Sequence, residues 1–85
     1  MKYCMIDKSV IEKKLKTSFK NAEFEVEVKK EGIKISIEGI GEDITTLFEK
    51  IGDLVSGLNK ISNTKNADVI ISIQGVAYGI ELEIY

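Results

Sequence analysis

Residues 24–38 read FEVEVKKEGIKISIE, and this stretch decides how the chain folds. Apolar residues recur at every second position on both sides of Lys30-Glu31-Gly32. A period of two is typical of β-strands with one buried face, and a charged, glycine-containing centre is typical of a tight turn. The stretch therefore predicts a β-hairpin, with strands over about residues 23–30 and 33–39, that has one apolar and one charged face.

Two helices and a second hairpin are predicted in the remainder of the chain. Apolar residues at helical spacing predict one helix from Ser9 to about residue 19 and a longer one to about residue 62 that opens at Glu42-Asp43. Ser9 and Glu12 have the spacing of a capping box at the start of the first helix. Alternating residues predict further strands over 67–75 and 78–85. Residues 1–6 allow a short additional strand.

The longer helix carries the strongest periodic signal in the sequence. Its apolar residues form one broad stripe: Ile44, Leu47, Phe48, Ile51, Leu54, Val55, Leu58 and Ile61. A stripe of this kind faces the core of a globular protein. We therefore expect Phe48 and Ile51 to be core residues.

The element order αββαββ predicts a single α+β domain over residues 1–85. Each hairpin must bury its apolar face, so we expect a two-layer sandwich with two helices on one face of a four-stranded antiparallel sheet. The halves resemble each other, since residues 20–28 align with 65–73 and residues 32–37 with 79–84. A duplicated helix–hairpin unit explains this match, and so does the shared composition of any two amphipathic hairpins. The pattern is too generic to indicate a known family.

The composition is typical of a soluble globular chain, with 44% hydrophobic and 31% charged residues. No apolar run approaches the roughly 18 residues that span a membrane, and the first residues lack the apolar segment of a signal peptide. The single Cys4 cannot form an internal disulfide, which suits a reducing compartment. We therefore expect a cytoplasmic protein that does not bind membranes.

The absence of His and Arg limits the chemistry of the chain. His is the usual acid–base group at neutral pH and the commonest metal ligand, and Arg provides bidentate recognition of phosphate. Cys4 has neither a second Cys nor a His for a zinc site or for activation as a nucleophile. Glu38, Glu42 and Asp43 lack the spacing of a calcium loop. We therefore expect no catalytic residue, no metal site, no cofactor and no enzymatic activity.

Charge is unevenly distributed along the chain. Residues 1–20 hold six Lys against two acids, a net charge of +4, and residues 21–85 hold six Lys against twelve acids, a net charge of −6. Lys13, Lys16 and Lys20 share one side of the first helix. Three lysines without Arg or an interleaved aromatic residue are a weak nucleic-acid signal, so we expect no direct nucleic-acid binding.

The charged face of the sheet is the best candidate for a functional surface. Its predicted partner-binding residues are Glu23, Glu25, Glu27, Glu38, Glu81, Glu83 and Tyr85. An antiparallel sheet can leave one face in water, and rows of carboxylates steer association with a basic protein surface. The same face carries Ile70, Ser72 and Gln74, so it is not purely charged. The alternative is that these glutamates only keep the sheet soluble and block aggregation at its edges.

These features together predict a small acidic protein-binding module, not an enzyme, whose partner is a protein with a basic surface. A more specific hypothesis is an inhibitor from a phage or mobile element, such as an anti-defence protein, that blocks a basic nucleic-acid-handling host protein. Two alternatives remain. One is a self-associating structural or regulatory subunit, for example a homodimer paired through an edge strand or the open face. The other is a small-ligand carrier.

Overall fold

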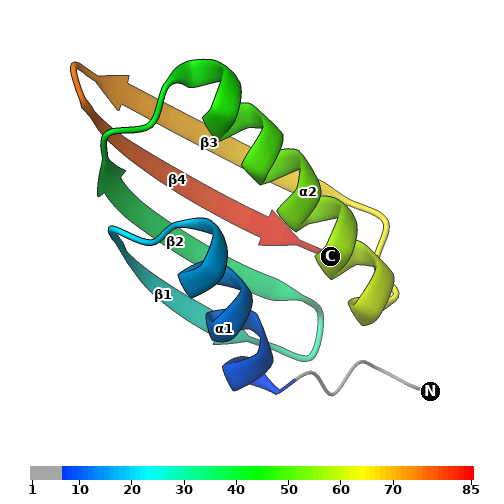
Figure 1. The fold of residues 1–85 in the computed structure, drawn as a ribbon. Coiled ribbons are helices and arrows are strands. Elements are labelled where there is room, and N and C mark those ends of the chain that lie inside the picture. The colour runs from blue at the N-terminus through cyan, green and yellow to red at the C-terminus, as the bar shows by residue number, and fades with distance from the viewer. Residues whose placement is uncertain (1–6) are drawn as a thin grey trace.

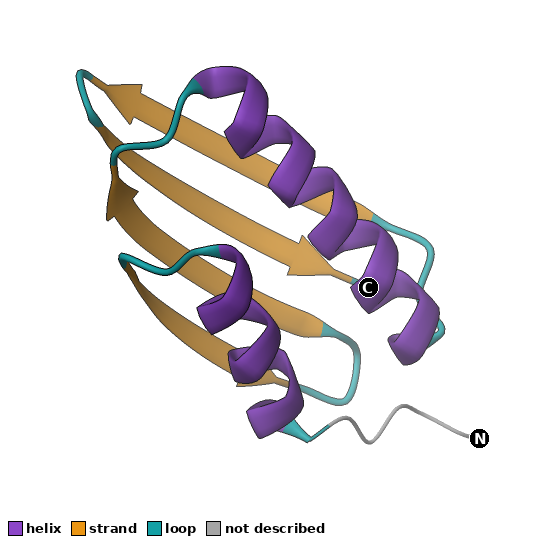
Figure 2. Ribbon diagram, in the orientation of Figure 1, coloured by secondary structure: helices purple, strands orange, loops and turns teal. Residues whose placement is uncertain are grey.

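The structure, a computed structural model, describes residues 7–85 and contains two helices and a four-stranded antiparallel sheet (Figure 1). Both helices lie on one face of the sheet, and no described helix or strand covers the other face (Figure 2). The predicted α+β sandwich with the order αββαββ is therefore confirmed. The suggested strand over residues 1–6 lies outside the described residues.

The ends of the elements agree with the sequence predictions to within two residues. The elements are α1 (Lys8–Ser18), β1 (Ala22–Val28), β2 (Ile33–Ile40), α2 (Ile44–Ser62), β3 (Ala67–Gln74) and β4 (Ala77–Ile84). Helical periodicity and strand alternation are local properties of the sequence, which is why these bounds were predictable.

Side chains that precede each helix determine where it begins. The N-cap of α1 is Asp7, whose carboxylate accepts a hydrogen bond from the Ser9 N–H at 3.2 Å. The capping box predicted at Ser9 is therefore wrong, because the N-cap is two residues earlier and Ser9 lies within the helix. Asp43 caps α2 by accepting from the Thr46 N–H at 2.7 Å. At the other end Asn63 adopts the left-handed conformation, with φ 56°, that commonly terminates a helix.

The strands lie in the order β1-β2-β4-β3, so β2 and β4 are central and β1 and β3 form the two edges. Ser36 of β2 lies directly opposite Glu81 of β4, 45 residues along the chain. The structural offset in the second strands is therefore 45, and not the 47 of the sequence match between residues 32–37 and 79–84. The turn at Lys30-Glu31 and the turn at Gly75-Val76 are related by the same offset of 45 residues. The sheet thus has the internal two-fold arrangement that a duplicated helix–hairpin unit would produce.

The core lies between the helices and the inner face of the sheet. Its buried hydrophobic residues are Ile11, Leu15, Phe19, Val26, Ile33, Ile35, Ile37, Leu47, Ile51, Leu54, Leu58, Tyr78, Ile80, Leu82 and Ile84. The prediction for Ile51 is therefore confirmed, but the prediction for Phe48 is wrong, because 54% of Phe48 is exposed. The apolar stripe of α2 is wider than the area that packs on β4, so Ile44 and Phe48 lie on its uncovered side.

Candidate protein-binding face of the sheet

The outer face of the sheet, turned away from both helices, collects the charged side chains of all four strands. Alternate residues of a strand point to opposite faces, so the positions between the core residues share the outer one. These strand positions hold Lys34 as the one cationic residue together with seven acids: Glu23, Glu25, Glu27, Glu38, Asp68, Glu81 and Glu83. All eight are exposed. The six glutamates selected from the sequence thus lie on one open surface, which we call the acidic face.

The strand register places acids directly opposite each other at two points of the acidic face. Glu23 of β1 lies opposite Glu38 of β2, and Asp68 of β3 lies opposite Glu83 of β4. Like charges in directly opposite positions destabilise a sheet. The fold therefore retains an electrostatic repulsion at both points.

Part of the acidic face is internally compensated, including Glu83 of the second acidic pair. Lys34 lies between Glu27 and Glu83 in the register, so it attracts both carboxylates. The Ser36 hydroxyl lies 3.1 and 3.2 Å from the two carboxylate oxygens of Glu81, to which it donates. The Glu23–Glu38 pair has no such neighbour in the register of the described strands, since Gly79 lies on the other side of Glu38 and Glu23 belongs to an edge strand.

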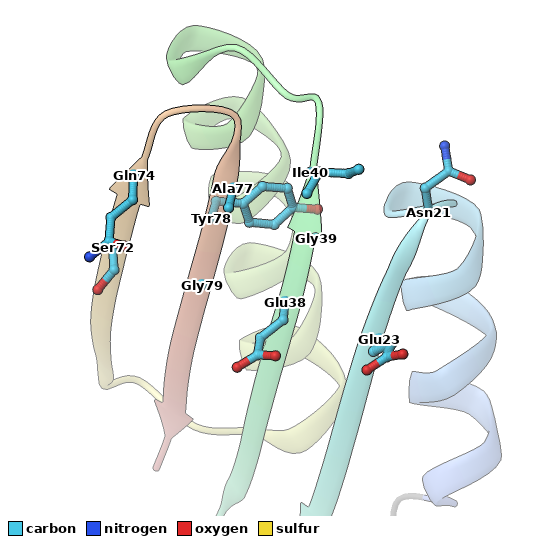
Figure 3. A pocket seen from close by; sticks show the side chains of 10 residues that line it. All are labelled: Asn21, Glu23, Glu38, Gly39, Ile40, Ser72, Gln74, Ala77, Tyr78 and Gly79. Atoms are coloured by element: carbon cyan, nitrogen blue, oxygen red, sulfur yellow. The ribbon is translucent and has the colours of Figure 1, made fainter.

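A shallow hollow of about 540 Å³ opens beside the Glu23–Glu38 pair (Figure 3). It exists because Gly79 of β4, which lies between Glu38 and Ser72 in the register, has no side chain. A Cβ built on Gly79 would meet nothing within 4 Å. The groups around the hollow include two carboxylates, the Ser72 hydroxyl and the Gln74 amide. All of these groups can accept hydrogen bonds from a lysine or arginine side chain.

Tyr85 lies at one corner of the acidic face, where it contacts the second acidic pair. Its hydroxyl donates to Asp68 Oδ2 at 3.0 Å. This hydrogen bond, with the charges of Asp68 and then Glu83, raises the pKa of Tyr85. Asp68 was absent from the partner-binding residues chosen from the sequence, because a bond between the ends of β3 and β4 depends on their pairing.

Glu42 and Asp43 both stabilise the start of α2. The sequence analysis considered these two residues, with Glu38, as ligands of a cation. Glu42 forms a salt bridge with Lys50 at 2.5 Å. Asp43 caps the helix, and its hydrogen bond from the Thr46 N–H lowers its pKa. Within residues 7–85, no group of three or more His, Cys, Asp and Glu side chains is placed to hold a metal ion.

A second surface, at the β3 edge of the sheet, was missed by sequence reasoning. Val69 and Ile73 point to the inner face but remain 38% and 40% exposed. Phe48 and Ile44 of α2 are 54% and 55% exposed. The sequence contains one indication of this surface. β3 reads ADVIISIQ and has one charged residue, whereas β1 reads AEFEVEV and has three.

No family model, no curated protein and no solved structure matches this chain. Neither helix described in residues 7–85 is long and apolar enough to cross a membrane. What the protein does must therefore be inferred from its own surfaces.

Proposed function

We propose that this chain is a small protein-binding module, without enzymatic activity, whose acidic face docks on a basic surface of another protein. The observation that supports this most directly is the opposition of Glu23 and Glu38 beside the hollow at Gly79. The two carboxylates repel each other in the free protein. A lysine or arginine side chain of a partner, seated in the hollow, would remove that repulsion and form charge-assisted hydrogen bonds.

The position of the acidic face on the sheet supports the same proposal. Strands hold side chains in fixed rows, so a partner meets a preformed charge pattern and little ordering is needed on binding. Ile70, which is 65% exposed, adds an apolar contact among the charged rows. The hollow is shallow and lies on the outer face, not between the two layers. It therefore favours a protein surface over the small ligand of a carrier.

A more specific form of the proposal is an inhibitor carried by a phage or mobile element and acting in the cytoplasm. Its target would be a host protein that handles nucleic acid, because such proteins present basic surfaces for phosphates. Rows of carboxylates on a rigid sheet imitate those phosphates, without direct contact between this chain and nucleic acid. The neighbouring genes test this form: phage or defence genes beside it favour the inhibitor, and an operon of unrelated metabolic enzymes argues against it.

The experiment that tests the proposal reverses three charges at once, in the variant Glu23→Lys, Glu25→Lys, Glu27→Lys. All three residues are exposed on the outer face of β1, so the fold should persist. Wild-type and variant chains are used to capture proteins from one lysate, and the association rate of the captured partner is then measured. We expect the variant to associate at least about ten-fold more slowly, since charge steering changes association rates by factors of about 10–1,000. The difference should shrink as salt is added.

The matched control reverses two exposed lysines of α1 and Lys20, which the sequence placed on the same helix but which lies two residues beyond its end, in the variant Lys13→Glu, Lys16→Glu, Lys20→Glu. This control changes the same number of charges on a different surface, and it should affect the rate less. If the glutamate variant binds at an unchanged rate while the lysine variant fails, the acidic face is only a solvated face. The functional surface would then be α1.

A further inference from the structure

Within residues 7–85, no strand pairs with the outer edge of β3, so this edge presents backbone groups that have no partner among the described residues. β3 is paired on one side, with β4. Asn66, the residue before β3, and Tyr85, the residue after β4, donate backbone hydrogen bonds to each other, at 2.8 and 3.0 Å. Bonded and non-bonded pairs alternate along an antiparallel ladder, so the even-numbered residues of β3 bond to β4. The N–H and C=O groups of the odd-numbered residues therefore point to the open edge: Ala67, Val69, Ile71 and Ile73.

The two edges of the sheet differ in their protection against pairing with another strand. Along β1, glutamates at 23, 25 and 27 alternate with apolar residues. Any antiparallel register of β1 with a second β1 that keeps the same faces aligned sets Glu opposite Glu, which is destabilising. β3 has Asp68 as its one charged residue. In a pairing of β3 with itself centred on Ile71, Asp68 lies opposite Gln74 of the second copy, and no two charges meet.

Above this edge, the second layer of the protein is also apolar and uncovered. Lys50 of α2 lies 5.5 Å from the ring of Phe19, and the Lys14 ammonium lies 3.8 Å from a Cβ built on Gly57, so this side of α2 faces α1. Ile44, Phe48 and Val55 lie about 150° around the helix from that side on average, at about 100° per residue. They therefore lie above β3. We call this surface the β3–α2 margin. Its exposed residues are Ile44, Phe48, Val69 and Ile73, and it includes Val55 and Ile71, which are half-buried against the core.

We propose that two copies of this chain associate through the β3–α2 margin, with the two β3 strands paired antiparallel about a two-fold axis at Ile71. The pairing satisfies the open backbone groups of both edges and joins two four-stranded sheets into one of eight strands. Val69 of one copy then lies opposite Ile73 of the other, and the uncovered sides of the two α2 helices pack together. Both acidic faces lie on the same side of the joined sheet.

The size of the margin is adequate for such a dimer. An eight-residue strand is about 27 Å long, and a helix on a sheet is roughly 20 Å deep with its side chains. The margin therefore covers about 500 Å² per copy, or about 1,000 Å² in total, which is the lower limit for a specific interface. The net charge of −2 is too small to oppose association of two copies.

The first test is the mass of the protein in solution, measured over a dilution series from the millimolar to the micromolar range. The wild-type chain should have twice the 9.5 kDa mass of one copy at high concentration and should dissociate on dilution. Val69→Lys points a charge into the margin and should weaken association at least ten-fold. Val10→Lys is the matched control, because Val10 is 48% exposed on α1, away from the margin, and this variant should remain dimeric.

The second test needs no variant and uses amide hydrogen exchange. In an isolated copy the amides of Val69, Ile71 and Ile73 face water and should exchange fast, whereas those of Ile70 and Ser72 are bonded to β4. In the dimer the first three should become protected, and their protection should fall on dilution. The β1 amides of Phe24 and Val26, which face the other open edge, should show no such change with concentration.

Three results would overturn the proposal. The first is a wild-type chain that stays monomeric over the whole series, which would leave the margin to a strand of a different protein. The second is a folded Val69→Lys variant that associates as tightly as the wild type, which would place the dimer contact elsewhere. The third is a protein with twice the mass of one copy, and therefore a dimer, in which the amides of Val69, Ile71 and Ile73 are not protected from exchange.

Discussion

The phenol ring of Tyr78 in β4 lies against the backbone of Gly39 in β2, its directly opposite residue (Figure 3). A Cβ built on Gly39 would stand 2.7 Å from Cζ of that ring, closer than side-chain atoms approach one another. Tyr78 is 7% exposed, and its ring centroid lies 6.4 Å from that of Phe19 at the end of α1. Burial, with a smaller contribution from the charge of Glu42, raises the pKa of Tyr78. The absence of a side chain at Gly39 thus lets Tyr78 lie between sheet and helix.

Gly39→Ala should destabilise the protein, because the added methyl group displaces the buried ring. Overpacking of this kind costs about 1–3 kcal/mol in the free energy of unfolding, which denaturant titration measures. In a Tyr78→Ala background the same change should cost less, since the ring is gone. A double-mutant cycle should therefore give a coupling of about 0.5–3 kcal/mol. Additive effects of the two changes would show that the contact does not limit packing.

Adjacent residues of α2 should respond differently to truncation. Leu47 is 1% exposed and Phe48 is 54% exposed. Leu47→Ala should cost about 2–5 kcal/mol of unfolding free energy, as for other buried leucines. Phe48→Ala should cost much less although it removes a larger side chain, provided that the protein is dilute enough to be monomeric. An equal loss at both positions would contradict the observed orientation of α2.

Two glutamates on β1 should have opposite effects on stability when their charges are reversed. Glu23 lies opposite Glu38, so Glu23→Lys replaces a repulsion with an attraction and should stabilise the protein by about 0.2–1 kcal/mol. Glu27 lies opposite Lys34, so Glu27→Lys should destabilise it by a similar amount. Thermal unfolding in low salt and in high salt tests this, because both effects should weaken with screening. Shifts of the same sign would mean that cross-strand charge does not control them.

Asp43 should make the stability of α2 depend on pH. The Thr46 N–H lowers the pKa of Asp43 below its ordinary value of 3.8, so the folded state favours the carboxylate. This contribution is present above pH 3.8 and is lost as the pH falls through the lower pKa of the folded state. Asp43→Ala should therefore reduce the melting temperature at neutral pH, by an amount that shrinks as the pH falls below 3.8.

Asn at position 43 provides the control for this pH effect. Asp43→Asn keeps an N-cap that accepts a hydrogen bond but does not titrate. Its melting temperature relative to the alanine variant should therefore be independent of pH in this range. A wild-type advantage over Asp43→Ala that persists unchanged at low pH would contradict the role of the carboxylate.

The acidic face shows which part of the site was predictable. Alternation along β1, β2 and β4 was sufficient to assign the six glutamates to one surface, because side chains of a strand alternate between its faces. The opposition of Glu23 and Glu38, the hollow at Gly79 and the Asp68–Tyr85 bond were not predictable. Each of these depends on which residues of separate strands become neighbours.

The sequence by itself determined the elements, their order and the face that each strand turns to the core, because periods of 2 and 3.6 residues are local. The tertiary structure alone decided the strand order β1-β2-β4-β3, and with it which strands are edges. It also decided which part of the α2 stripe is buried: Ile51 is 6% exposed, but Phe48, three residues earlier, is 54% exposed. The physical reason is that a helix buries only the side that another layer covers, and α2 rests on β4 and leaves its side above β3 open.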